Sequence, residues 1–213
     1  MSGRVSGKTI DSTTEARIKS AARLIFTQKG YAATRTRDIA NEAGINLALL
    51  NYYFRSKEKL FDIIMLESMQ GFILTIAPVF KDESTSLEEK IQSLVNQYID
   101  LLSEQPDIPL FVLSELRSHP EKLISKMNMK EHLINSYFFK QIQQAIKEGK
   151  IPPIHPLHFI MNLMGMIVFP FVASPILKNI GGLNQEEFNA LMQRRKTYIP
   201  LWIESMSKVK YII

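Results

Sequence analysis

The chain has 213 residues, which is enough to bury a hydrophobic core and to form one large or two small domains. Apolar residues make up 46% of the sequence and charged residues 22%, as in an ordinary globular protein, so a wholly disordered chain is excluded. The net charge is +5, and the absence of cysteine excludes disulfides, a thiolate nucleophile and a cysteine zinc site.

The positive charge is concentrated near the N-terminus. Residues 1–56 carry nine Lys or Arg and four Asp or Glu, an excess of five that equals the net charge of the whole chain. Residues 57–213 therefore hold equal numbers of bases and acids. A solvated basic surface would give the same count, but so would a small domain that meets a polyanion beside a larger, neutral domain.

The hydrophobic pattern predicts about nine helices and no strand, so the expected fold is all-α. The first helix is expected to begin at a capping box of Ser12 and Glu15 and to end at Gly30, after a flexible arm at residues 1–11. Further helices, bounded by capping residues, glycines and prolines, are predicted at residues 36–43, 47–54, 57–77, 86–103, 109–118, 121 or 127 to 148, 157–173 and 185–209.

The second and third predicted helices have the spacing of a helix-turn-helix. Counting from Thr36, a small residue is fifth (Ala40) and a glycine is ninth (Gly44), where helices cross closely and where the turn needs a positive φ. The small core that fixes the angle between the helices is expected to contain Ile39, Ile45, Leu50 and Phe54.

The third helix is predicted to present an outer face to DNA. Asn46 can cap its first turn, and Leu47, Ala48, Asn51 and Tyr52 are expected to face outward while Leu50, Tyr53 and Phe54 face inward. An apolar side chain can contact a thymine methyl, and asparagine pairs with adenine in the major groove. We expect Leu49 to pack as satellite core instead.

The segment GYAATRTRDIANEAGINLALLNYYFRSKEKLF, residues 30–61, resembles the DNA-binding domain of the TetR family of transcriptional regulators. The resemblance covers residues 14–66, and beyond it only length and helix count agree. It implies a bacterial homodimer with a helix-turn-helix DNA-binding domain at residues 1–56. A larger ligand-binding and dimerisation domain would follow at residues 57–213, with the last two helices pairing the subunits.

The resemblance also implies roles for single residues. Thr36 and Arg37 would face phosphate or a base edge, Leu47, Ala48 and Asn51 would face bases, and Tyr52, Tyr53 and Lys57 would reach the DNA backbone. The sequence departs from the family at Arg35, where a capping Ser or Thr is usual and Thr34 is expected to cap instead, and also at Leu49 and Asn51. The predicted DNA-binding set is Arg35, Thr36, Arg37, Asn46, Leu47, Ala48, Asn51, Tyr52, Tyr53 and Lys57.

The segment from Phe159 to Leu177 is apolar nearly all round. Its length suggests a membrane span, but its polar residues and prolines and the lack of a basic flank argue against one. A helix that is buried on one face by its own domain and on the other by a partner is also apolar nearly all round. The last predicted helix is amphipathic and contains Pro200, which is expected to kink it. The expected dimer interface contains Ile160, Met164, Ile167, Val168, Phe171, Leu191, Tyr198 and Trp202.

Apolar stripes in the second domain indicate a pocket for a small hydrophobic or aromatic effector, although plain core is an equal alternative. The expected lining residues are Phe72, Phe111, Glu115, Tyr137, Gln141, Met161 and Met164. His155 and His158 have a spacing that can bind metal, but no carboxylate or cysteine lies near them in sequence, so a structural role is expected. No catalytic pattern appears, and no cofactor is expected.

The sequence therefore predicts a cytoplasmic regulator, nucleoid-associated when bound to double-stranded DNA, that represses transcription as a homodimer. A small, largely apolar ligand would release it from a palindromic operator, and no catalytic or membrane role is expected. The alternative is a DNA-binding regulator controlled by a protein partner, or by no effector at all. A lipid-binding or membrane-associated protein is a third, more distant possibility.

Overall fold

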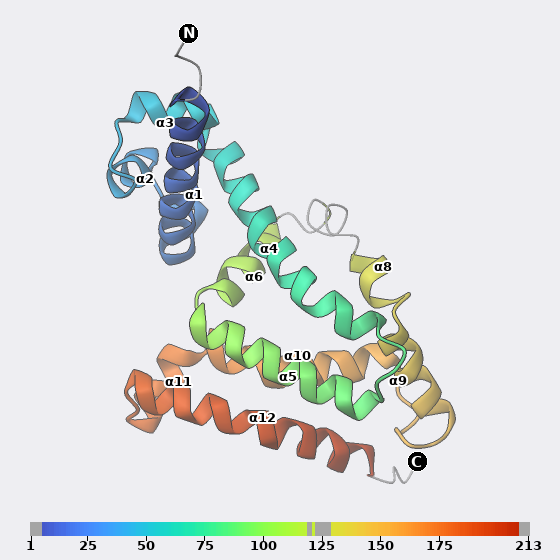
Figure 1. The fold of residues 1–213 in the computed structure, drawn as a ribbon. Helices are drawn as coiled ribbons and strands as arrows, with labels where there is room; N and C mark the ends of the chain where they lie inside the picture. Colours follow the sequence, from blue (N-terminus) through green and yellow to red (C-terminus); the bar gives the residue numbers. More distant parts are fainter. Residues whose placement is uncertain (1–5, 119–120, 122–128, 209–213) are drawn as a thin grey trace. The chain divides into compact units, whose positions relative to one another are not determined.

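The computed structural model describes residues 6–118, 121 and 129–208, which form helices and no strand, as predicted (Figure 1). Eleven helices are described, two more than expected. In the order of Figure 1 they are α1 (Ser6–Ala33), α2 (Thr36–Glu42), α3 (Leu47–Phe54), α4 (Lys57–Lys81), α5 (Leu87–Glu104), α6 (Ile108–Ser118), α8 (Met129–Leu133), α9 (Tyr137–Lys147), α10 (Pro156–Val172), α11 (Ser174–Gly181) and α12 (Gln185–Ser207).

The chain divides into two compact units, Met1–Gly71 and Phe72–Ile213. Helix α4 begins in the first unit and ends in the second. The expected functional division at residue 56 lies before this helix and stays a prediction.

The first unit is built on apolar side chains that α1, α2, α3 and the start of α4 turn toward one another. Phe26 and Phe61 meet edge to face, with ring centroids 4.9 Å apart. Truncating one of the larger fully buried residues to alanine is expected to cost about 2 to 5 kcal/mol, whereas Ala22 is already that small. These residues are Ile18, Ala22, Phe26, Ile39, Leu50, Leu60 and Ile64.

The turn between α2 and α3 has the predicted geometry. Gly44 adopts φ +63°, a conformation that glycine reaches without steric cost. The guanidinium of Arg17 donates a hydrogen bond to the Ala43 carbonyl at 2.6 Å and so fastens the turn to α1. Asn46 caps α3, because its Oδ1 accepts a hydrogen bond from the Leu49 N–H at 2.8 Å. The helix-turn-helix is therefore fixed at both ends of its turn.

Three predicted helix boundaries, both ends of α1 and the end of α4, differ from the structure. Helix α1 starts at Ser6, so Ser12 does not cap it, and no proline before Ser12 prevents the helix from extending. The flexible arm expected at residues 1–11 stays a prediction. Gly30 interrupts α1 with φ +72°, as the predicted stop requires, but the chain resumes helical geometry to Ala33. Helix α4 passes through Pro78, near which it was expected to end, and continues to Lys81.

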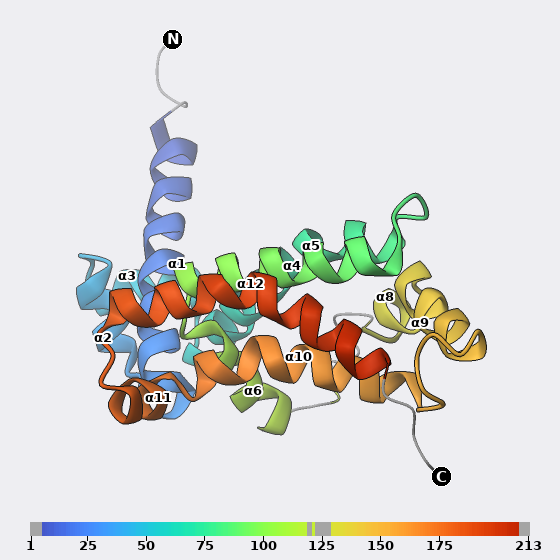
Figure 2. The same ribbon diagram turned by 90° about the horizontal axis from the view of Figure 1, so that it is seen from below.

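The second unit packs around α5 and α10. Helix α5 contacts α9, α10 and α12, and α10 also contacts α6, α9, α11 and α12. Figure 2 shows α10 and α12 lying side by side. The capping boxes predicted for α5, at Ser86 and Glu89, and for α12, at Asn184 and Glu187, are both present. Local capping chemistry thus sets the start of two long helices of this unit.

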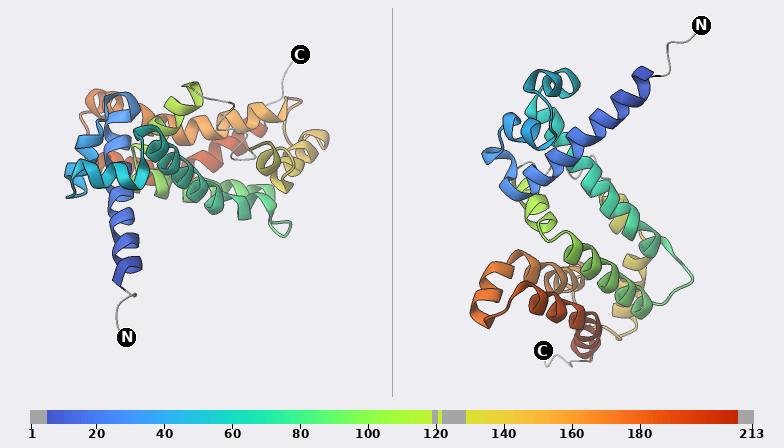
Figure 3. Two further views of the ribbon diagram at one scale, coloured as in Figure 1. Left: turned by 90° about the horizontal axis from the view of Figure 1, so that it is seen from above. Right: turned by 60° about the vertical axis from the view of Figure 1, so that its left-hand side comes forward.

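The remaining differences explain the two additional helices. The helix predicted to run to residue 148 is divided, because Ser136 is an N-cap whose Oγ accepts from the Phe139 N–H at 3.1 Å and starts α9 there. The start of that prediction, before residue 129, lies outside the described residues. After α10 the chain bends by 70° into α11, which was not predicted (Figure 3). Helix α12 continues through Pro200, and its kink stays a prediction.

A buried lysine organises the loop between α4 and α5. Lys90 is only 1% exposed, and its ammonium donates to the Thr85 carbonyl at 2.7 Å and to the Thr85 hydroxyl at 2.6 Å. The ammonium also lies 5.3 Å from the centroid of the Tyr137 ring. Gln141 on α9 donates to the same Thr85 carbonyl at 2.8 Å. These bonds join the loop to α5 and α9.

Candidate nucleic-acid interface and effector pocket

Helix α3 presents a short polar and apolar face to solvent. Leu50 and Phe54 are buried beneath it, whereas Ala48, Asn51 and Tyr52 are exposed, Tyr52 to 76%. Leu47 and Tyr53 are half-buried. Asn51 and Tyr52 come three and four positions after Ala48, so all three lie on one face of α3, where side chains can reach base edges.

The expectation for Leu49 was wrong. Its side chain is 36% exposed and does not join the core of the unit. Its neighbour Leu50 occupies the inward position, and one residue along a helix rotates a side chain by about 100°. Leu49 therefore lies on the flank of α3, where it can also contact DNA.

The start of α2 exposes two arginines. Arg35 and Arg37 are exposed and Thr36 is half-buried. The Asp38 carboxylate accepts from the Arg35 backbone N–H at 3.5 Å and pairs with Lys29 at 3.1 Å. Lys29, and then the backbone bond, lower the pKa of Asp38.

Thr34 does not take over the cap of α2. Its hydroxyl is buried and donates to the Gly30 carbonyl at 2.7 Å. The hydroxyl thus points back to α1 because the kink at Gly30 leaves a carbonyl within reach. That part of the capping prediction was wrong.

Lys57 is bonded within the protein. Its ammonium donates to the carbonyls of Tyr31 and Thr34 at 2.9 and 3.0 Å and lies 4.2 Å from the centroid of the Tyr31 ring. These bonds tie the start of α4 to the segment between α1 and α2. A contact between Lys57 and phosphate stays a prediction, and it would have to compete with these bonds.

Many of the basic side chains of the first unit have partners within it. Lys19 and Arg23 both pair with Glu67, at 3.0 and 3.1 Å, which joins α1 to α4. The side chains of Arg37 and Arg55 form no hydrogen bond or ion pair with any residue that the structure describes. Arg55 directly follows α3 with φ +55°. The sequence analysis missed it, although an arginine just beyond a recognition helix is a recognisable signal.

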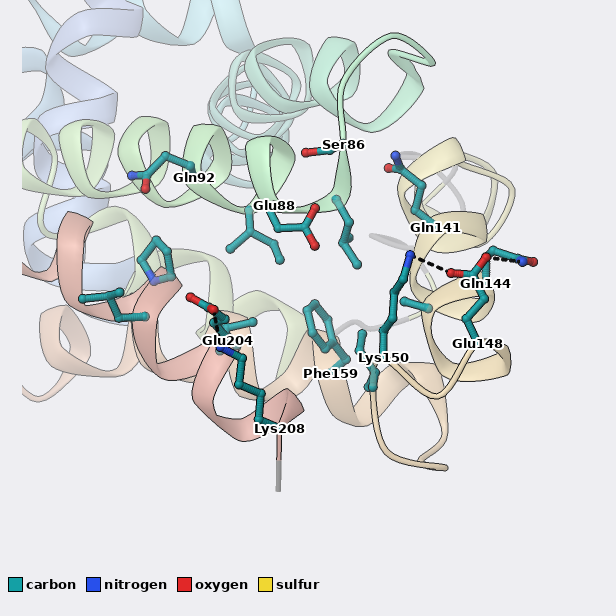
Figure 4. Close-up of a pocket in the computed structure, with 17 residues that line it drawn as sticks. Ser86, Glu88, Gln92, Gln141, Gln144, Glu148, Lys150, Phe159, Glu204 and Lys208 are labelled. Atoms are coloured by element: carbon teal, nitrogen blue, oxygen red, sulfur yellow. Dashed lines mark hydrogen bonds and ion pairs between the residues drawn. The ribbon is translucent and has the colours of Figure 1, made fainter. Parts of the chain in front are cut away.

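A pocket of about 730 Å³ lies within the second unit (Figure 4). Of the residues predicted to bind ligand, Gln141 lines it. Phe111 is buried in its own unit, whereas Met161 is exposed and Tyr137 and Met164 are half-buried, and none of these four lines the pocket. The side chains of Phe72 and Glu115 lie outside the described residues. The lining comes from segments far apart in the chain, which explains why stripes along single helices did not identify it.

The predicted dimer residues fall into two groups. Leu191, Tyr198 and Trp202 on α12 are exposed, as an interface requires, and Ile160, Met164 and Val168 on α10 are half-buried. Ile167 and Phe171 are buried in the core of their own unit, so they are not available to a partner. The exposed apolar side chains nearby are instead Met161, Phe169, Ile176 and Ile180.

The sequence also raised a metal site at His155 and His158 and a membrane span. His155 caps α10, because its Nδ1 accepts from the Leu157 N–H at 3.2 Å. No group of three His, Cys, Asp or Glu residues that could hold a metal ion occurs in the described parts of the chain. Among the same residues no single helix is long and apolar enough to cross a membrane; only the bent pair α10 and α11 passes by length and composition.

Comparisons with known proteins agree with this geometry. The family model described as "Bacterial regulatory proteins, tetR family" matches residues 18–64. The chain is 31% identical over 151 residues to the HTH-type transcriptional regulator RutR of Escherichia coli O157:H7, covering 68% of each chain. It is 26% identical over 172 residues to the probable HTH-type transcriptional regulator YttP of Bacillus subtilis (strain 168), covering 79% of this chain and 82% of the relative.

Solved structures share the fold. The transcriptional regulator FadR from Bacillus subtilis, in complex with stearoyl-CoA, superposes with a TM-score of 0.62 at 19% identity, covering 90% of this chain and 98% of FadR. The putative transcriptional regulator SCO4942 from Streptomyces coelicolor gives a TM-score of 0.61 at 17% identity, covering 91% and 97%. At these identities the likeness shows the arrangement of helices alone.

Proposed function

Since this chain belongs to the TetR family of DNA-binding transcriptional regulators, which are not enzymes, we propose that it is a repressor whose homodimer binds a palindromic operator. A small, largely apolar ligand in the second unit releases it. The protein then acts in the bacterial cytoplasm, on the nucleoid while it is bound to DNA.

The observation that carries this proposal is the exposed face of α3 on a rigid support. Asn51 can donate to and accept from an adenine edge, and the Ala48 methyl can contact a thymine methyl. The buried Leu50 and the Asn46 cap hold the helix in place beneath that face. Arg35 and Arg37 at the start of α2 and Arg55 directly after α3 can neutralise phosphates without reading sequence.

The proposed dimer is matched to the spacing of successive major grooves on DNA. Two copies of α3 must lie about 34 to 36 Å apart to enter successive major grooves on one side of the duplex. The exposed apolar residues of α12, with those of α10, supply a surface that two copies of the chain can share. A two-fold dimer requires an operator with matching two-fold symmetry.

Release from DNA by a ligand follows from the thermodynamic linkage between ligand binding and DNA binding. A ligand that binds the free dimer more tightly than the DNA-bound dimer must weaken DNA binding by the same factor. The pocket of the second unit has a volume typical of small-molecule sites. FadR of Bacillus subtilis, which has the same fold, was solved with stearoyl-CoA, and this supports a ligand with a large apolar part.

The experiment that tests the proposal is selection of bound duplexes from a random pool by the purified protein at physiological salt. Enrichment of a palindrome with half-sites about one helical turn apart supports the proposal. Absence of enrichment, also after denaturation and refolding to remove a bound ligand, contradicts it. A regulator controlled by a protein partner would enrich the same palindrome but would not be released in a screen of small apolar ligands.

A further inference from the structure

The pocket in the second unit has an apolar floor and a charged mouth. The floor is formed by side chains from α5, α9, α10 and α12 and from the segment after α9. Its buried members are Ile91, Ala145, Ile151, Phe159 and Ile203. This floor can hold an alkyl chain or a ring system by burial of apolar surface alone.

Four of the five charged side chains that line the pocket form ion pairs, and one does not. Lys150 pairs with Glu148 at 2.8 Å and Lys208 pairs with Glu204 at 2.6 Å. The fifth charged residue, Glu88, forms no hydrogen bond or ion pair with any described residue, and its charge raises the pKa of Lys150 less than that of Glu148 does. Figure 4 shows its carboxylate pointing into the space between α5, α9 and α12. The pocket therefore contains three carboxylates and two ammonium groups, and the charge without a direct partner is negative.

The glutamine side chains of the lining also differ in their partners: the amide nitrogens donate to protein oxygens, but one amide oxygen has no donor. The Gln141 amide nitrogen donates to the Thr85 carbonyl, and the Gln144 amide nitrogen donates to Glu148 at 2.7 Å. The Gln92 amide nitrogen donates to the Lys196 carbonyl at 3.0 Å. A carbonyl can only accept, so the orientation of the Gln92 and Gln141 amides is fixed, and the buried Gln141 Oε1 has no partner among the described residues.

The polar groups of the lining that lack a partner are thus acceptors. Each lysine and glutamine side-chain nitrogen in it donates at least one hydrogen bond or pairs with a protein oxygen, whereas the Glu88 carboxylate and the Gln141 amide oxygen have no donor among the described residues. A ligand with a carboxylate or phosphate would have to share a lysine that Glu148 or Glu204 already pairs with, and would lie near an unpaired carboxylate. A ligand with an ammonium group would break no bond and would neutralise Glu88.

We propose that the effector of this pocket is an amphipathic cation, in which an apolar chain or ring system lies on the floor and an ammonium group pairs with Glu88. This inference rests on the proposed function, because it names the ligand class of the pocket through which release occurs. The positive charge of the proposed ligand distinguishes this chain from a regulator that binds an anion with an apolar part of similar size.

The test compares three probes with the same alkyl chain, decylammonium, decanoate and 1-decanol, by calorimetric titration of the full-length protein below their micelle concentrations. We expect decylammonium to bind about tenfold more tightly than decanoate, with decanol between them. Glu88→Gln should weaken decylammonium binding by about fivefold and leave decanol binding unchanged.

Glu186→Gln is the matched control. Like Glu88, Glu186 is an exposed carboxylate in the first turn of a helix, so both substitutions remove the same favourable interaction with the helix dipole. Glu186 does not line the pocket. We expect Glu186→Gln to bind all three probes as the unmodified protein does.

Three outcomes would overturn the inference: decanoate binding at least as tightly as decylammonium, unchanged decylammonium affinity in Glu88→Gln, or binding of none of the probes. Operator binding, measured on the same samples without probe, reports on the proposed DNA-binding function separately. Glu88→Gln should retain that operator affinity and require more decylammonium to release the DNA.

Discussion

At the scale of single residues, Gly44 is the position where backbone conformation most directly controls the DNA-binding surface. An alanine there would be strained at φ +63°, and its Cβ would lie 3.0 Å from Arg17 Nη2. We expect Gly44→Ala to lower the free energy of unfolding by about 1 to 3 kcal/mol and to weaken operator binding. Chemical denaturation and a DNA-binding titration measure the two effects.

Gly149→Ala separates strain from steric contact. Gly149 has φ +71°, but a Cβ there would meet nothing within 4 Å. We expect Gly149→Ala to show the backbone strain alone and to leave operator affinity unchanged. If both variants lost operator affinity equally, the special role of the turn at Gly44 would be wrong.

Asn51 and Arg37 should differ in what they contribute to binding. Asn51→Ala should cost about 1 to 3 kcal/mol at one base position and relax the preference there, because a bidentate adenine contact is lost. Arg37→Ala should weaken binding to all sequences alike and reduce the salt slope by about one, as expected for a phosphate contact. Competition titrations with single-base operator variants at several salt concentrations measure both.

Equal losses of affinity on every DNA sequence from Asn51→Ala and Arg37→Ala would contradict these roles.

Lys57→Ala is a less informative test of phosphate binding than the sequence suggested. Its ammonium bonds the carbonyls of Tyr31 and Thr34, so its removal should lower the stability of the unit as well as DNA affinity. Arg37 makes no such internal bond, and its substitution therefore reports on DNA alone.

At the scale of elements, the sequence predicted helices well where capping chemistry is local. The starts of α3, α5 and α12 depend on a side chain that bonds a backbone N–H three residues away, and such pairs are visible in the sequence. The same signal at Ser12 failed, because a capping pattern does not stop a helix that the preceding residues can extend. Ser136 was overlooked inside a continuous apolar pattern, although it divides that segment.

The loop between α4 and α5 should give the protein a pH-dependent stability. Hydrogen bonds from the Ser84 side chain, the Ser84 backbone and Thr85 lower the pKa of Asp82 to about 2 from its ordinary value of 3.8. Because the folded state holds this carboxylate ionised, its contribution is fully present above about pH 4 and is lost as the pH falls toward 2.

We expect Asp82→Asn to be less stable than the unmodified protein at pH 7, with a smaller difference at pH 3. Thermal unfolding across this pH range measures it. Glu83→Gln, at the next position of the loop, is the control, since Glu83 makes none of these hydrogen bonds. A stability difference between Asp82→Asn and the unmodified protein that does not change with pH would contradict the role of the loop.

At the scale of the whole molecule, the two candidate sites differed in how far sequence could predict them. The residues proposed to face DNA come mainly from two adjacent short helices and one turn, so their spacing in sequence fixes their position in space. The pocket joins α5, α9, α10 and α12, and a residue such as Glu88 acquires its significance only from the neighbours that these helices bring together. Ile167 and Phe171 were misassigned because an apolar sequence does not show which face a chain buries within itself.

The last prediction concerns the assembly of two chains on one operator. Leu191 lies on α12 and is 46% exposed, and burying it against a second copy would remove apolar surface from water. Leu191→Glu should place a charge in that contact and shift the protein to monomers in sedimentation equilibrium. Because two linked half-site contacts bind far more tightly than one, operator affinity should fall by about 100-fold or more.

Leu110→Glu places the same charge on α6 at a leucine that is 62% exposed and is not among the predicted dimer residues. We expect this control to remain dimeric and to bind the operator normally. If Leu191→Glu also remained dimeric, the partner surface would lie elsewhere than on the exposed face of α12. If it became monomeric but bound the operator with full affinity, the DNA complex would not depend on the dimer, and the requirement for a palindrome would disappear with it.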